Sequence, residues 1–64
     1  MNNIEIITKF INSESLPNLD SIISGMIGEN KILKDFQLTP YQYSNLPYNL
    51  TVSTYFLVVT AQNI

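Results

Sequence analysis

The sequence of 64 residues contains no cysteine, histidine, tryptophan or arginine. Zinc, haem and iron–sulfur centres depend mainly on cysteine and histidine ligands, so we expect no bound metal and no other cofactor. Without cysteine there are no disulfide bonds, and cysteine usage gives no information about the compartment. No histidine is present to activate a serine, and no serine–lysine spacing is typical of a catalytic dyad. We therefore expect a protein that is not an enzyme.

Charged residues are also scarce, at 12% of the chain, with a net charge of −2 against about 25% charged residues in an ordinary soluble domain. Nucleic-acid binding needs clustered basic side chains, and three lysines cannot form such a cluster. The five carboxylates are scattered along the chain and are interpreted as solvated surface charges and helix-end charges. We expect no nucleic-acid partner and no acid–base pair.

Long apolar runs are missing as well. The longest is Tyr55–Val59, whereas a membrane-spanning helix needs about 20 residues. Met1-Asn2-Asn3 lacks the basic start of a secretory signal, so we expect a cytoplasmic protein with no membrane contact. Asn, Ile, Lys, Tyr and Phe make up 27 of the 64 residues, which fits an AT-rich coding sequence and a phage or mobile-element origin.

The chain is long enough for a single small domain, residues 1–64, which buries roughly 60% of its unfolded surface. Apolar residues nevertheless reach 45% of the composition. A small chain with much apolar surface and few charges either self-associates or binds a partner. We expect a homo-oligomer, a protein partner, or both.

Residues 3–13 are predicted to form an amphipathic helix, because five apolar side chains fall within an arc of about 160° at helical spacing. A strand is the alternative, since Ile4, Ile6 and Phe10 alternate with Glu5 and Lys9. In a strand, however, Ile7 and Ile11 would lie on the other face. The apolar set is Ile4, Ile6, Ile7, Phe10 and Ile11.

A second helix is predicted to begin at Ser15 or Leu16, before Pro17, and to end at Gly28 as a left-handed cap. Residues 30–36 favour a third short helix, with a strand over residues 32–38 as the alternative. The apolar face of the second helix contains Leu16, Leu19, Ile22, Ile23, Met26 and Ile27.

Residues 39–49 contain two prolines and three tyrosines and are predicted to form an ordered, extended loop. Tyr41, Tyr43 and Tyr48 are candidates for contacting a partner or ligand, because tyrosine is enriched in interfaces. The alternative is that these rings cover a small core that lacks tryptophan.

Residues 50–61 are predicted to form a strand, because threonine, valine and aromatic residues dominate and glycine and proline are absent. Its second half is apolar on both faces, which is typical of a strand covered on two sides. The predicted fold is α+β: two or three short N-terminal helices packed on a small sheet that contains this long C-terminal strand. The expected oligomer interface contains Tyr55, Phe56, Leu57, Val58 and Val59.

From these observations we expect a non-catalytic protein-binding module, such as a small intracellular regulator or inhibitor that masks a surface of its partner. Two alternatives stay open. One is an oligomer that sequesters a nucleotide-like small molecule, and the other is a structural subunit of a larger assembly.

Overall fold

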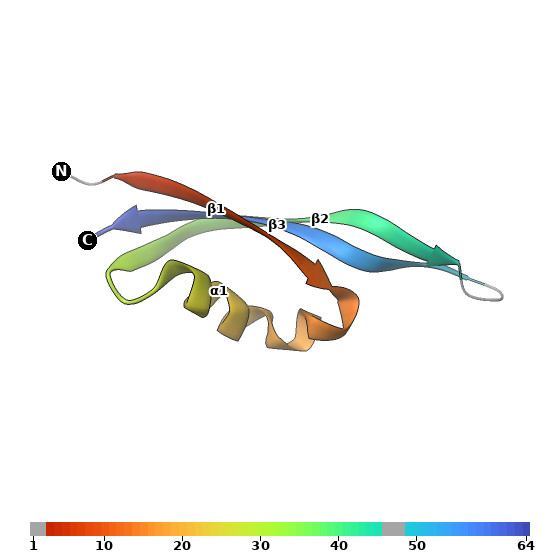
Figure 1. Cartoon of the computed structure of the whole chain (residues 1–64). Helices are drawn as coiled ribbons and strands as arrows, with labels where there is room; N and C mark the ends of the chain where they lie inside the picture. Colours follow the sequence, from red (N-terminus) through yellow and green to blue (C-terminus); the bar gives the residue numbers. More distant parts are fainter. Residues whose placement is uncertain (1–2, 46–48) are drawn as a thin grey trace.

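The computed structural model describes residues 3–45 and 49–64 as a three-stranded antiparallel sheet with one helical segment on one face (Figure 1). The strands are β1 (Ile4–Asn12), β2 (Lys31–Asn45) and β3 (Leu50–Asn63). Between β1 and β2, a 3-10 helix η1 (Ser13–Asn18) leads directly into α1 (Leu19–Ile27). The fold is therefore mostly strand with one helical segment, and the prediction of two or three helices is wrong.

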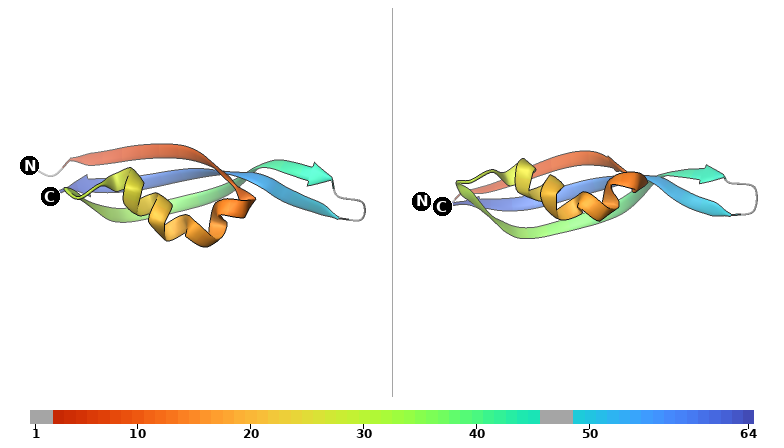
Figure 2. Two further views of the ribbon diagram at one scale, coloured as in Figure 1. Left: turned by 60° about the horizontal axis from the view of Figure 1, so that its bottom comes forward. Right: turned by 90° about the horizontal axis from the view of Figure 1, so that it is seen from below.

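The strands lie in the order β1-β3-β2, so the last strand of the chain occupies the middle of the sheet. Because β1 and β2 are both antiparallel to β3, they run parallel to each other on its two sides. The helical segment connects them and crosses one face of the sheet (Figure 2). Both edges of β3 are thus paired within the chain, and β1 and β2 form the edges of the sheet.

The first element is a strand, and the prediction of a helix over residues 3–13 is wrong. β1 pairs with β3 in a regular register that includes Ile7↔Val59 and Phe10↔Phe56. Paired residues share a face, and successive residues alternate between faces. Ile7 and Ile11 therefore face the helical segment, whereas Ile6 and Phe10 face the opposite side. The strand is apolar on both faces, which is why its period resembled that of a helix.

The helix predicted from the apolar set around Ile23 is confirmed, although its first turns are the 3-10 helix that contains Pro17. Ile23 is buried, and Leu19, Ile22, Met26 and Ile27 pack around the core. The helix ends at Gly28, which has a φ of 75°. The Gly28 N–H donates to the Ser24 carbonyl oxygen at 3.1 Å. A positive φ favours glycine, as the sequence predicted at this position.

β2 replaces two predicted elements. Residues 30–36 do not form a helix, and residues 39–45 of the predicted loop belong to β2. Pro40 lies within β2, where an edge strand tolerates the missing N–H. The register shifts around Leu33/Asp35 and again between Pro40 and Tyr43. The predicted C-terminal strand is confirmed, and it extends to Asn63.

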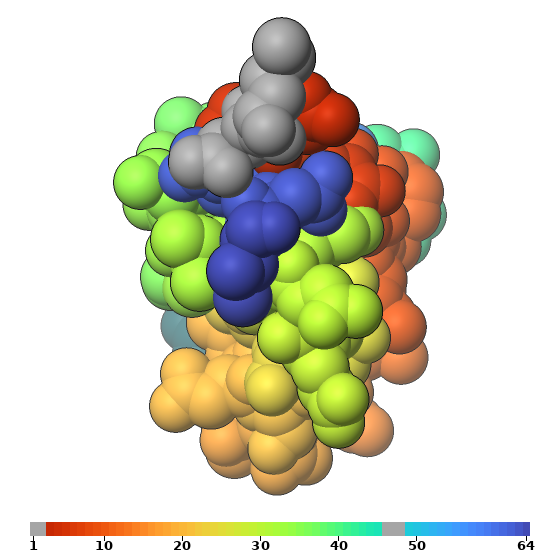
Figure 3. Space-filling model, turned by 90° about the vertical axis from the view of Figure 1, so that its left-hand side faces the viewer, coloured from red at the N-terminus to blue at the C-terminus, as the bar shows by residue number. Residues whose placement is uncertain are grey.

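The core is small and lies between β3 and α1. Among the described residues, the buried apolar side chains are Ile11, Ile23, Leu57, Val59 and Ala61. An end-on view shows the helical segment below the three strands (Figure 3). The molecule measures 52 × 16 × 12 Å, because the β2–β3 hairpin continues past the end of β1 (Figure 2). We call residues 43–45 and 50–53 the hairpin arm.

Candidate functional site: the uncovered face of the sheet

The face of the sheet opposite the helical segment is the main candidate site, and we call it the open face. Its members follow from the register, because partners across neighbouring strands share a face. Along β3 they are the even-numbered residues from Thr54 to Gln62, whereas the buried Leu57, Val59 and Ala61 lie on the helix side. The open-face positions are Ile4, Ile6, Thr8, Phe10 and Asn12 of β1; Thr54, Phe56, Val58, Thr60 and Gln62 of β3; and Ile32, Asp35, Gln37, Thr39 and Gln42 of β2.

Large apolar side chains on this face are exposed to solvent. Ile6 is 66% exposed and Phe10 is 54% exposed, whereas Leu57 on the other face of the sheet is fully buried. Ile4 and Ile32 are exposed at the same end of the sheet, where both pair with Gln62. Soluble monomers rarely expose contiguous apolar patches beyond a few hundred Å², and larger patches usually mark an interaction site.

Three aromatic rings form a cluster that crosses the whole open face. The centroid of Phe10 lies 4.6 Å from that of Tyr41 and 5.1 Å from that of Phe56, with tilted ring planes. These distances are in the favourable range for aromatic pairs. Phe10, Phe56 and Tyr41 belong to β1, β3 and β2 respectively, so the cluster reaches both edges of the sheet. Tyr41 joins it from the irregularity between Pro40 and Gln42, and its own ring is 57% exposed.

Charged side chains are concentrated away from the open face. In the register of β1, Glu5 and Lys9 lie on the helix side, where Glu5 forms an ion pair with Lys31. Among the described open-face positions in register, Asp35 alone is charged. The open face therefore combines large apolar side chains with threonine, glutamine and asparagine, and its charged position in register, Asp35, lies on the edge strand β2. Such a surface offers little attraction for a charged ligand.

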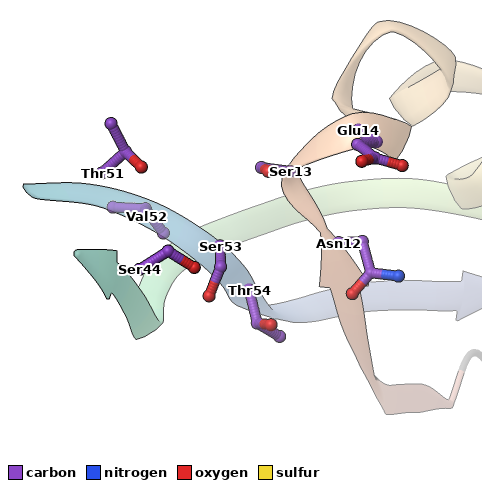
Figure 4. A pocket seen from close by; sticks show the side chains of 8 residues that line it. All are labelled: Asn12, Ser13, Glu14, Ser44, Thr51, Val52, Ser53 and Thr54. Carbon is purple, nitrogen blue, oxygen red and sulfur yellow. The ribbon is translucent and has the colours of Figure 1, made fainter. Parts of the chain in front are cut away.

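A second candidate is a hollow of about 380 Å³ where the hairpin arm leaves the sheet (Figure 4). Its described lining contains hydroxyl and amide groups, one carboxylate and no lysine, so it provides no cation for a phosphate and no pair of titratable groups. The Ser53 hydroxyl donates to the carbonyl oxygen of Gln42 at 3.3 Å. The lining residues are Asn12, Ser13, Glu14, Ser44, Thr51, Val52, Ser53 and Thr54.

The described part of the chain contains neither a metal-binding cluster nor a membrane-spanning helix. Within residues 3–45 and 49–64, no three acidic, histidine or cysteine side chains come together in a way that could hold a metal ion. No helix within those same residues has both the length and the apolar character needed to cross a membrane.

The predicted site residues separate between the two faces. Tyr41 lies on the open face, Tyr43 is exposed in the hairpin arm, and Tyr48 is outside the described residues. Of the expected interface residues, Phe56 and Val58 are on the open face. Leu57 and Val59 are in the buried core, and half-buried Tyr55 lies on the helix side with Ile11.

Sequence reasoning missed the part of the open face that comes from β1 and from the start of β2. The missed residues are Ile4, Ile6, Phe10 and Ile32, which had been assigned to helices. The alternation of Ile4, Ile6 and Phe10 with Glu5 and Lys9 was the signal that could have found most of them.

Comparison of the chain with models of protein families, with curated proteins and with solved structures gives no match.

Proposed function

We propose that this protein is a non-catalytic protein-binding module that buries the open face of its sheet against an apolar surface of another polypeptide chain. The proposal rests on one observation. The sheet has apolar side chains on both faces, but the helical segment packs on only one of them. The helical segment covers the side of Leu57 and Val59, although Leu33 and Phe36 on that side stay 42% exposed. On the side of Phe10 and Phe56, no element packs over the sheet within the described residues. A regulator that masks a partner would act through this surface.

The size of the effect is adequate for binding. Covering roughly 400 Å² of apolar surface, at about 25 cal/mol per Å², contributes about 10 kcal/mol before the costs of association. Those costs are estimated at about 4–15 kcal/mol. At the lower end of that range about 6 kcal/mol remains, which corresponds to a reversible complex. The aromatic cluster of Phe10, Tyr41 and Phe56 supplies the rigid anchors that usually dominate such an interface.

A structural subunit of a larger assembly is the second candidate. The outer edges of β1 and β2 have no strand partner within the described residues, and unpaired edges are able to accept strands of other chains. A nucleotide-sequestering role has less support, because no lysine lines the hollow beside the hairpin arm.

The proposal is tested by placing a photo-reactive phenylalanine derivative at Phe10 and, as a control, at Ser21, which is exposed on α1. Both variants are expressed in cells of the source organism and irradiated, and the products are separated by mass. We expect a discrete protein adduct from position 10 and none from position 21. No protein adduct from position 10, in a variant that folds, contradicts the proposal.

A further inference from the structure

We propose that the chain covering the open face is a second copy of this protein, stacked sheet to sheet about a two-fold axis near Val58. This inference rests on the proposed function and names its partner. In the resulting dimer the layers would be helix, sheet, sheet and helix, with the two sheets about 10 Å apart, as in other stacked sheets.

The exposed area of the single chain is the first argument. A compact monomer of 7.3 kDa is expected to expose about 4200 Å², whereas this chain exposes 4811 Å². The radius of gyration is 14.0 Å, against about 11 Å for a compact domain of this length, and the hairpin arm that extends past β1 contributes to this value. The excess of roughly 600 Å² approaches the area of about 800 Å² that each partner buries in a standard interface.

The charge distribution is the second argument. A face that packs on its own copy brings each charged residue close to its equivalents, so a self-complementary face must carry few charges. The open face comes close to this condition, because Glu5, Lys9 and Lys31 all lie on the helix side. The charges near it are Asp35, in register on the open face, and Lys34, at the irregularity beside it on the edge strand β2. Asp35 lies on β2, away from the middle strand, so two copies need not bring these carboxylates together.

The pattern of β3 is the third argument. Phe56 and Val58 on one face match Leu57 and Val59 on the other, which is the pattern of a strand covered on both sides. The helical segment provides one cover. A second copy of the open face provides the other cover. Because the two faces are identical, each presents the same apolar area as the one it covers.

Pairing of two sheets edge to edge is the main competing arrangement. The edge of β1 is free within the described residues and could accept another β1. That arrangement would leave Ile6 and Phe10 exposed, and Phe56 and Val58 half-buried, in both copies. It therefore leaves the exposed apolar side chains of the open face uncovered, whereas face-to-face stacking covers them.

Val58 provides a test that depends on the two-fold axis. It lies on the middle strand in the row Thr8–Val58–Gln37, near the centre of the open face. A residue on a two-fold axis meets its own copy. Val58→Lys and Val58→Glu should each place two like charges in contact, and an equimolar mixture should place opposite charges in contact.

The experiment is sedimentation velocity at about 100 µM and low salt, where charge effects are weakly screened. We expect the unmodified protein to sediment as a dimer, each Val58 variant as a monomer, and the mixture as a dimer. Ser21→Lys and Ser21→Glu, on the exposed side of α1, are the matched controls and should stay dimeric. Circular dichroism checks the fold. If lysine at position 58 prevents folding, Ile6→Lys replaces it, because Ile6 is 66% exposed on an edge strand.

The outcomes separate the two proposals. A dimer that resists both Val58→Lys and Ile6→Lys overturns the open face as the interface, and two monomeric Val58 variants that fail to combine overturn the axis near Val58. An unmodified monomer that crosslinks from position 10 to a different protein overturns the second copy and leaves the proposed function standing. A monomer with no such crosslink overturns both.

Discussion

Gly25 and Gly28 lie close together at the C-terminal end of α1 but have different backbone conformations. A Cβ atom added at either position would meet no other atom within 4 Å. Gly25→Ala should therefore raise the free energy of unfolding by about 0.5–1 kcal/mol, because alanine favours the helix. Gly28→Ala should lower it by about 1–2 kcal/mol, because an L-residue is strained at a φ of 75°.

Urea denaturation of the two glycine variants, at one fixed protein concentration, provides the measurement. Each variant is the control for the other, since both replace an exposed glycine by the same residue. A shift of both midpoints in the same direction would show that α1 does not end at Gly28.

Tyr41 and Tyr43 are both more than half exposed, but only Tyr41 contacts the ring of Phe10. Tyr41→Ala should weaken self-association by roughly 5- to 30-fold, the effect of losing about 1–2 kcal/mol at an interface. Tyr43→Ala, in the hairpin arm, is the matched control and should change the dissociation constant little. Sedimentation equilibrium measures both. Unfolding of the Tyr41 variant would instead show that this ring covers the core.

Neighbouring residues of β3 should respond differently to truncation, because alternate side chains serve opposite faces. Leu57 is fully buried against Ile23 and Val59, so Leu57→Ala should cost about 2–5 kcal/mol and unfold much of a domain this small. Phe56→Ala removes an open-face ring and should leave the folded monomer largely intact while reducing association.

Circular dichroism at low protein concentration, combined with sedimentation at high concentration, separates the effects of Leu57→Ala and Phe56→Ala. Equal loss of monomer stability in both variants would mean that the two faces of β3 contribute equally to the single chain. The helical segment would then not be the main cover of the sheet.

The sequence predicts an element correctly where its residues follow one pattern only, either the apolar spacing of a helix or the composition of a strand. In α1 the apolar residues around Ile23 repeat only at helical spacing, and β3 is long and rich in β-branched and aromatic residues. β1 could not be assigned in this way, because apolar residues on both faces of a strand also fill one side of a helix. Residues of β1 form a strand and not a helix because they pair with β3, which is distant in the sequence.

β2 was missed for a different reason. Pro40 and the tyrosines around it indicate a turn in most sequences, yet an edge strand with bulges accommodates them. Only part of the open face was therefore predictable: the sequence singles out Tyr41, Phe56 and Val58, whereas its pattern places Phe10 and Ile6 in a helix. Placing them together requires the strand order, which a local pattern does not contain.

The whole molecule has a small core for its length, and no disulfide bond is possible in a chain without cysteine. If a second copy covers the open face, association stabilises the folded state by mass action. The Tm of the unmodified protein should therefore rise by several degrees over a 100-fold increase in concentration. The Tm of Val58→Lys should stay constant, which scanning calorimetry can measure; a constant Tm in both proteins would contradict the dimer.

The position of β3 between β1 and β2 also has a consequence for synthesis on the ribosome. β1 and β2 are made first, but they are not neighbours in the sheet and have no strand to pair with until β3 emerges. The nascent chain therefore holds the isoleucine-rich β1 unpaired until β3 has been made, a state open to chaperones and to aggregation. A ribosome that stops before residue 50 releases a chain with no sheet at all rather than part of one.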